Sequence, residues 1–311
     1  MTDTTREILE KHEIRKTKKQ KADFRDFLAK RSSELGYRSC VEKGVYGARN
    51  VVIGSPTTAK VVYTAHYDTP AGVPFPNLIT PKCIPLYILY QLLISVLLFT
   101  VPMLIILLVP GAIMDGGGSP LLAGAFILIG YALLLGECYL LVAGPANKHN
   151  SNDNTSGVTV LLDLMEAMPA EKRQEVAFIF FDLEEMGCLG SQSYRKNHAK
   201  AMKTVPVINF DCVSDGETIL FAVGKKAAGL SDKLKEAYVS NGTFTVDIAT
   251  KGVFYPSDQK SFELGVGVAA LNKTKHGLLY TSRIHTKNDT VYNEANIAFL
   301  VDGSVKLAQI I

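Results

Sequence analysis

Tryptophan is absent from this chain of 311 residues, and cysteine is scarce. The five cysteines include no Cys-x-x-Cys pair, and their odd number argues against a disulfide framework, so we expect reduced thiols in a cytosolic environment. The net charge of +3 is close to balance and gives no reason to expect a nucleic-acid partner. The first residues are polar and charged, which predicts no secretory signal peptide.

Charge is also missing from two long stretches. Cys83 to Val109 is a run of about 27 residues without a charge, and Leu121 to Ala143 is a run of about 23 in which only Glu137 is charged. Each run is long enough to span a bilayer. Two buried core helices are the alternative, but soluble helices of this length usually keep a polar stripe. We therefore predict a transmembrane helical hairpin, with the turn-rich segment Pro110 to Pro120 as its connector.

The lysines around these runs predict their orientation. Lys82 and Lys148 flank the hairpin, whereas the connector carries only Asp115. The positive-inside rule then places both ends of the hairpin, and the domain attached to them, in the cytoplasm. The basic run Lys11 to Lys21 near the N-terminus agrees with this orientation; it is either a solvated helix face or a contact with anionic lipid headgroups. The expected location is an integral membrane protein with two spans and a cytoplasmic N-terminus.

Outside the hairpin, short apolar runs alternate with amphipathic stretches. Residues 5–36 have the apolar spacing of one or two amphipathic helices. Strands are predicted at 50–53, 60–65, 176–181, 205–210, 219–223, 244–248 and 266–271. Helices are predicted at 158–168, 187–198, 225–239 and 293–311, with another opening at 255–262. This alternation is typical of an α/β fold with a mixed, largely parallel central sheet covered by helices on both faces.

The predicted organisation has three parts. Residues 1–45 form a basic, amphipathic N-terminal segment, and residues 82–143 form the transmembrane hairpin. Residues 46–81 and 144–311 together form the α/β domain, which the hairpin interrupts.

The strongest chemical signal follows the strand Val176 to Phe181. Two adjacent carboxylates, Glu184 and Glu185, come just after this strand, at the edge where open α/β sheets bind ligands. Neighbouring side chains there point in different directions, so one glutamate can hold a metal while the other faces what the metal activates. Other metal-ligating side chains follow other predicted strands or loops: His66, Asp68, Asp153, Asp211 and His285.

The order of these motifs resembles a known family. This chain is similar to the di-zinc aminopeptidases of peptidase family M28, which carry the same motifs in the same order. The motifs are His-x-Asp, Asp-Asn-x-Ser-Gly, Glu-Glu-x-Gly-x-x-Gly-Ser, an Asp after a strand and His-Thr-x-x-Asp-Thr. The resemblance covers roughly residues 46–81 and 144–311. It implies a zinc-peptidase fold, two Zn²⁺ per chain and hydrolysis of peptides that have a free N-terminus.

The resemblance also implies a role for each site residue. The metal ligands would be His66, Asp153, Glu185, Asp211 and His285. Asp153 would bridge the two ions, one ion being completed by His66 and Asp211 and the other by Glu185 and His285. Asp68 would orient the imidazole of His66. Glu184 would act as the general base toward a metal-activated water.

Three departures from the family bear on access and specificity rather than on chemistry. The hairpin lies between the His-x-Asp motif and the bridging Asp153, where relatives usually have a short loop. Ser257-Asp-Gln259 stands where relatives often have Ser-Asp-His. Ile284 precedes His285 where an aromatic residue is common.

Other functions remain as alternatives. A glutaminyl cyclase shares the fold and the Glu-Glu pair, but it resembles a one-zinc enzyme with a tryptophan-lined pocket, which this chain cannot build. His66 together with Asp211 favours two metals. A non-catalytic membrane receptor or scaffold would keep the fold, but the complete ligand set and Glu184 argue against it. A transporter would need more than two spans and hence a homo-oligomer.

The sequence therefore predicts a membrane-anchored metallopeptidase of the aminopeptidase type. Because the hairpin emerges beside the metal motifs, we expect the cleft to lie close to the lipid bilayer. The expected substrates are peptides that are apolar or generated at the membrane.

Overall fold

The computed structural model describes residues 2–311, and its central element is one sheet of nine strands. Their bounds are β1 Ser39–Lys43, β2 Arg49–Gly54, β3 Val61–His66, β4 Val176–Phe181, β5 Val207–Phe210, β6 Thr218–Val223, β7 Thr245–Ala249, β8 Gly265–Lys273 and β9 Leu279–Tyr280. The order is β1-β2-β4-β3-β5-β8-β6-β7, with β9 on β8. The central strands β4, β3, β5 and β8 are parallel, while β2 and β6 join them antiparallel. The mixed, largely parallel sheet is thus confirmed.

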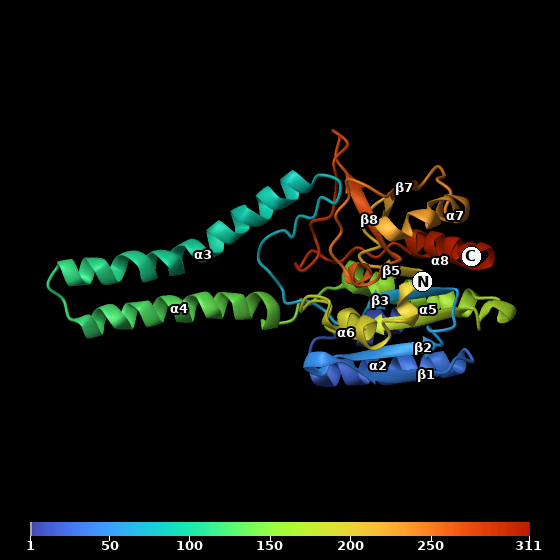
Figure 1. Ribbon diagram of the computed structural model, residues 1–311, viewed down its shortest axis with the longest axis horizontal. Helices are drawn as coiled ribbons and strands as arrows, with labels where there is room; N and C mark the ends of the chain where they lie inside the picture. Colours follow the sequence, from blue (N-terminus) through green and yellow to red (C-terminus); the bar gives the residue numbers. More distant parts are fainter. Residues whose placement is uncertain (1) are drawn as a thin grey trace.

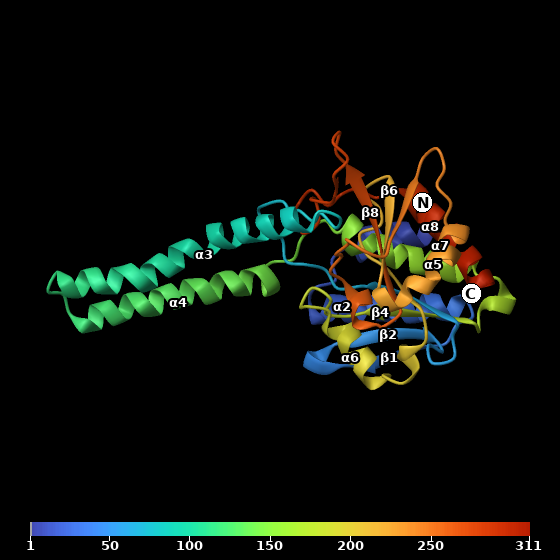
Figure 2. The same ribbon diagram turned by 45° about the horizontal axis from the view of Figure 1, so that its top comes forward.

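Helices cover both faces of the sheet (Figures 1 and 2). Their bounds are α1 Asp3–Lys11, α2 Lys18–Glu34, α5 Gly157–Ala167, α6 Leu189–Asn197, α7 Ser231–Ala237 and α8 Glu294–Ile310. One apolar core joins α1, α2, α5, α7 and α8 to one face, and a second core joins α6 to the other. Strand β4 is buried at every position because Phe180 packs into the first core and Phe181 into the second.

The hairpin consists of α3, Ile84–Asp115, and α4, Pro120–Ala143, which project together from one side of the domain (Figure 1). Their most apolar windows have mean hydropathies of 3.0 and 2.1 and are only 6% buried. Both helices are therefore long and apolar enough to cross a membrane, on length and composition alone. The two pack closely at Gly130, where a Cβ atom would lie 2.5 Å from Ile106 Cγ1.

The connector of the hairpin is shorter than the sequence predicts. Pro110 lies inside α3, which continues to Asp115. The helix instead ends at the glycine run, where Gly117 has a φ of +75° that other residues rarely adopt. The residues from Gly111 to Asp115 extend α3 by more than a turn.

The basic N-terminal run is partly buried, which neither of its two interpretations anticipates. Lys21 Nζ lies 2.7 Å from Asp182 Oδ1 inside the domain. Arg15 is fully buried and donates to Tyr67 O at 2.5 Å and to Thr155 Oγ1 at 3.1 Å. These contacts fasten the N-terminal segment onto the ends of the central strands.

The prediction of a helix opening at 255–262 is wrong. Only a 3₁₀ turn, Asp258–Ser261, forms there. Asn209 Nδ2 of β5 donates to Ser257 Oγ at 2.9 Å and to Gln259 Oε1 at 3.2 Å, which holds this segment against the sheet. The sequence did not predict β1 or β9. No residue of β1 is buried, so it shows no apolar pattern, and β9 has only two residues.

Candidate metal centre

The predicted metal ligands meet at the carboxyl edge of the sheet. His66 is the last residue of β3, and Asp211 directly follows the neighbouring strand β5. Glu184 and Glu185 lie in the loop after β4, which pairs with β3 on its other side. Parallel neighbours end at the same edge, so the fold itself brings these side chains together.

The first cluster contains His66, Asp153 and Asp211. His66 Nε2 lies 3.2 Å from Asp153 Oδ1 and 3.5 Å from Asp211 Oδ1. His66 Nδ1 lies 3.1 Å from the main-chain oxygen of Asp68. A carbonyl oxygen can only accept, so this contact requires the proton on Nδ1. Nε2 is then the ring nitrogen that faces the carboxylates.

The second cluster shares Asp153 with the first. His285 Nε2 lies 3.0 Å from Asp153 Oδ2 and 3.4 Å from Glu185 Oε2. Asp153 therefore faces one histidine with each carboxylate oxygen. In each cluster the three donor atoms lie within 4.8 Å of one another. A carboxylate between two donor sets is the arrangement by which two metal ions share a ligand.

The cluster has the chemistry of a cation site. Among residues 2–311, the buried oxygens Asp153 Oδ1 and Glu185 Oε1 have no hydrogen-bond partner. Burial, and then the charge of Asp153, raises the pKa of Glu185 well above its ordinary value. Buried carboxylates without a compensating charge are costly, and a divalent cation would offset that cost. Imidazole nitrogens and carboxylate oxygens together suit zinc.

Glu184 lies beside the two clusters that share Asp153 but is a member of neither. Burial, and further the charge of Glu185, raises the pKa of Glu184 well above its ordinary value, against the effect of His66. Glu184 Oε1 accepts from Cys188 Sγ at 3.4 Å. With His66 and Glu185 it also forms a third possible donor set within 4.8 Å. Its position accordingly suits either a base or an additional ligand.

Asp68 contacts the glutamates more closely than it contacts the imidazole. Its carboxylate accepts the main-chain N–H of Glu184 at 3.0 Å and of Glu185 at 3.3 Å. The distance from Asp68 Oδ1 to His66 Nδ1 is 3.7 Å, too long for a hydrogen bond. The side chain of Asp68 thus fixes the Glu-Glu loop, while its main chain orients His66.

Two further carboxylates at the site have no role in the sequence analysis. Asp289 accepts the main-chain N–H of Asn152 at 2.9 Å and of Asp153 at 3.0 Å, which positions the shared ligand. Burial, and then the charge of Asp153, raises the pKa of Asp289 to about 8. Burial likewise raises the pKa of Asp258, which is fully buried, to about 7. Asp289 belongs to the His-Thr-x-x-Asp-Thr motif and Asp258 to the segment Ser257-Asp-Gln259, so a signal for each was present in the sequence.

The backbone is strained where it presents the site. His285 has a φ of +62°, Leu183 before the glutamates has +58°, and Cys212 after Asp211 has +58°. Each such residue costs on the order of 1 kcal/mol and persists only where surrounding contacts enforce it. Strain that gathers at three ligand-bearing loops is typical of a functional site.

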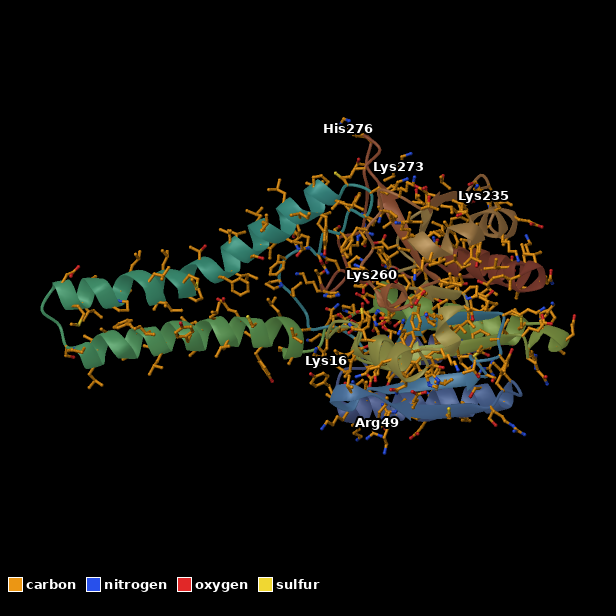
Figure 3. The ribbon with its side chains drawn as sticks, in the orientation of Figure 1. Lys16, Arg49, Lys235, Lys260, Lys273 and His276 are labelled. Carbon is orange, nitrogen blue, oxygen red and sulfur yellow. The ribbon has the colours of Figure 1, made fainter. Side chains whose placement is uncertain are left out.

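A cleft of about 260 Å³ lies over the clusters. Its lining comprises His66, Asn77, Ile79, Tyr87, Gln91, Asp153, Glu184, Glu185, Asp211, Cys212, Tyr255, Pro256, Ile284 and His285. Two of these residues, Tyr87 and Gln91, belong to α3 of the hairpin. A larger cavity of about 620 Å³ lies between Glu185, Lys16 and the last turn of α4. In Figure 3, Lys16 lies where α4 meets the domain, and its Nζ donates to Val142 O at 3.0 Å.

Comparison with known proteins identifies the fold and a family. A sequence profile described as Peptidase family M28 matches residues 144–300. The LapA aminopeptidase of Legionella pneumophila has 15% sequence identity and a TM-score of 0.57, over 98% of this chain and 69% of LapA. The glutaminyl cyclase of Porphyromonas gingivalis has 16% identity and a TM-score of 0.58, over 99% of this chain and 95% of the cyclase. A search of curated sequences finds no match to this chain.

Both kinds of solved relative share this fold. A glutaminyl cyclase of Bacteroides thetaiotaomicron has 14% identity and a TM-score of 0.58, over 98% of this chain and 94% of the cyclase. Identities this low show a common architecture and leave the reaction open. The choice between reactions therefore depends on the residues of the cleft.

Proposed function

The chain belongs to peptidase family M28, and on that premise we propose that it is a membrane-anchored di-zinc aminopeptidase. The observation that carries the proposal is the shared ligand Asp153, which faces His66 with one oxygen at 3.2 Å and His285 with the other at 3.0 Å. One zinc ion would be held by His66, Asp153 and Asp211, and the other by Asp153, Glu185 and His285.

Bound zinc would supply Lewis-acid chemistry in the cleft. Glu184 takes the proton of the attacking water and passes it to the leaving amine, because its carboxylate lines the cleft beside the ligands. Asp68 keeps Glu184 in place through the main-chain N–H at 3.0 Å. Asp289 holds the loop of Asp153 in the same way at 3.0 Å. Every charged side chain in the cleft lining is thereby assigned to a ligand or to the base.

The glutaminyl cyclase reading is weaker at two points. The pair of His66 Nε2 and Asp211 Oδ1, 3.5 Å apart beside Asp153, supplies a second donor set that a one-zinc enzyme does not need. The chain has no tryptophan with which to line a cyclase pocket. A receptor or scaffold function is disfavoured because no member of either donor set is missing.

We further propose that α3 and α4 cross a membrane and that the domain and the N-terminus lie in the cytoplasm. Lys82 and Lys148 flank the hairpin on the domain side. In membrane vesicles of known orientation, Gly117→Cys should react with an impermeant maleimide added on the non-cytoplasmic side. The exposed native Cys40 should react only from the opposite side. Labelling of both positions from one side would contradict the two spans.

The reaction is tested by zinc content and by hydrolysis of amino-acid amides and short peptides. Wild-type protein should hold two zinc ions per chain and release single N-terminal residues. Glu184→Gln should keep both ions and lose activity by at least about 100-fold, the usual contribution of a general base. Glu10→Gln, at an exposed position of α1, serves as the matched control and should be fully active.

Two results would contradict the proposed function. One zinc ion per chain would remove the role of Asp153 as a shared ligand. Two ions without turnover, or release of ammonia from N-terminal glutamine, would move the assignment to the scaffold or to the cyclase.

The expected substrate preference is for peptides that are apolar or generated at the membrane, because α3 reaches the cleft. In detergent, peptides with apolar first residues should be hydrolysed faster than those with charged first residues. Equal rates would argue against this preference while leaving the peptidase reaction intact.

A further inference from the structure

The first turns of α3 are fastened to the domain. Lys82 Nζ, just before the helix, lies 2.7 Å from Asp247 Oδ2. The ring of Tyr87 packs on Phe254 with centroids 5.8 Å apart, and the hydroxyl of Tyr90 donates to Pro76 O. The start of the hairpin is therefore held in a defined position beside the domain loops.

This docking presents one face of α3 to the metal cleft. Tyr87 and Gln91 are four residues apart, lie on the same side of the helix, and both line the cleft. Leu89 and Leu92 on other sides of the same turns are 64% and 58% exposed. The same two turns thus form a wall of the cleft on one side and an apolar outer surface on the other.

Gln91 differs from the polar residues further along α3. Ser95 Oγ donates to Gln91 O at 2.7 Å, and Thr100 Oγ1 donates to Val96 O at 2.5 Å, so both hydroxyls are satisfied by their own helix. Within residues 2–311, the side-chain amide of Gln91 has no hydrogen-bond partner. The amide of Asn77, which lines the same cleft, has none either. A peptide main chain offers the donor and the acceptor that a side-chain amide needs.

The rest of the lining suits one uncharged residue. Apart from the donor sets and Glu184, it contains only uncharged side chains, among them Ile79, Tyr255 and Ile284. The volume of about 260 Å³ lies just below the range of roughly 300–1,000 Å³ typical of small-molecule pockets, so it is small for an extended peptide.

We propose that the first two turns of α3 form a specificity-determining wall of the substrate pocket. Tyr87 contacts the side chain of the N-terminal residue, and the Gln91 amide hydrogen-bonds the main chain of the substrate. The preferred substrates are peptides whose first residue is large and uncharged. This inference rests on the proposed peptidase function and adds that the hairpin itself selects the substrate.

The position of the substrate can be measured without turnover. The probe is a tetrapeptide amide whose first residue is p-benzoylphenylalanine, irradiated with zinc-loaded, full-length Glu184→Gln protein in detergent and mapped by mass spectrometry. We expect adducts within residues 84–95 that an excess of Leu-Gly-Gly amide suppresses. Adducts confined to residues 184–192 or 255–261, or labelling that the competitor leaves unchanged, would overturn the proposal.

Substitutions then separate contact from folding. Gln91→Ala should raise the KM for peptide amides roughly three- to tenfold, as expected for one lost hydrogen bond, with unchanged zinc content. Leu92→Ala, on the outer face of the same turn, should leave the KM unchanged. Equal KM values for wild type and Gln91→Ala would remove the role of Gln91.

The aromatic contact is tested by a specificity ratio. Tyr87→Ala should lower the preference for N-terminal Leu over Ala at least about fivefold, and Tyr87→Phe should retain it because the ring remains. The same ratio in all three proteins would overturn the role of Tyr87.

These results distinguish the inference from the proposed function. If wild-type protein hydrolyses peptides but adducts form only on domain loops, the proposed role of α3 is refuted and the proposed peptidase function stands. If adducts on residues 84–95 are suppressed by the competitor but wild-type protein hydrolyses no peptide, the proposed peptidase function is refuted and the role of α3 in the pocket stands.

Discussion

The domain and the hairpin bury opposite kinds of side chain. In α5, eight of the 11 residues are buried, whereas in α3 only Pro102 of 32 residues is. The domain encloses His66, Asp153 and other polar groups, while the hairpin exposes leucines such as Leu97, at 65%. Figure 3 shows the same contrast, with mostly carbon side chains along α3 and α4 and nitrogen and oxygen concentrated in the domain.

The contrast shows two solutions to the same physical problem. In water, exposed apolar area is unfavourable, so a helix such as α3 is suited to an apolar solvent. In the domain, buried charge is tolerated where it is paired, as at Lys21 and Asp182. The metal clusters are the place where this pairing is incomplete, because among the described residues the buried oxygens Asp153 Oδ1 and Glu185 Oε1 have no hydrogen-bond partner. A bound cation would pair with these buried carboxylate charges.

The largest effect should come from removing the shared ligand. Asp153→Asn should lose both zinc ions. Activity should fall by more than about 100-fold, which is the largest loss usual for residues that only support a metal ligand. Zinc content measured by elemental analysis, together with peptide hydrolysis, checks this. Asp163→Asn, in the same segment of the chain but outside both clusters, is the control. Retention of two ions in Asp153→Asn would break the link between unpaired buried charge and metal binding.

Removing one member of the buried ion pair should destabilise the domain strongly. Lys21→Met leaves Asp182 without its cation at 2.7 Å and should lower the free energy of unfolding by about 3–5 kcal/mol, measured by denaturant unfolding. Lys18→Met, at an exposed position of the same helix, should change it little.

A compensating change sharpens that test. Adding Asp182→Asn to Lys21→Met removes the unpaired charge and should recover much of the loss. If Lys21→Met and Lys18→Met had equal stability, the buried pair would contribute no more than a surface lysine.

A charge placed on the hairpin tests whether α3 is surrounded by lipid or by water. Leu97→Arg should disfavour membrane insertion by about 2.5–3.5 kcal/mol, read as the fraction of chain that integrates into microsomes. Val239→Arg, at a domain position that is 63% exposed, should integrate like wild type. Equal integration of the two variants would mean that α3 does not lie in the bilayer.

The predictable features are those with a repeating pattern. The strand Val176–Phe181 was predicted to the residue, because an unbroken apolar run between polar segments has one interpretation in a sheet covered on both faces. The hairpin was likewise visible from two long apolar runs, although its first helix continues past Pro110 and ends at Asp115. The grouping of the metal ligands required the family resemblance in addition to the pattern.

Contacts between segments far apart in sequence could not be predicted. Nothing local indicates that Lys21 pairs with Asp182, or that Asp289 holds the loop of Asp153. The entry of Gln91 into the cleft depends on how the hairpin docks, which its uncharged sequence does not specify. The tertiary arrangement decides these contacts.

A smaller effect is expected at the support of the shared ligand. Asp289→Asn should weaken zinc binding about 10- to 100-fold, because an amide has one accepting oxygen and cannot receive both the main-chain N–H of Asn152 and that of Asp153. Competition with a zinc chelator measures the affinity. Asn288→Asp, at the exposed neighbouring position, is the control and should keep the affinity within a factor of two or so, as usual for surface changes.

The smallest effect concerns a half-buried carboxylate, Asp163, outside the metal clusters. Burial, and then the charge of Glu166, raises the pKa of Asp163 from its ordinary value of 3.8 to about 6. Between these two values the folded state binds more protons than the unfolded state, so this group lowers stability as pH rises through that window. The melting temperature of Asp163→Asn relative to wild type should therefore increase from pH 4 to pH 6 and then level off. Asp26→Asn, at an exposed position of α2, should show a smaller change over the same range. Parallel curves for wild type and Asp163→Asn would show that this half-buried carboxylate is as well solvated as one on the surface.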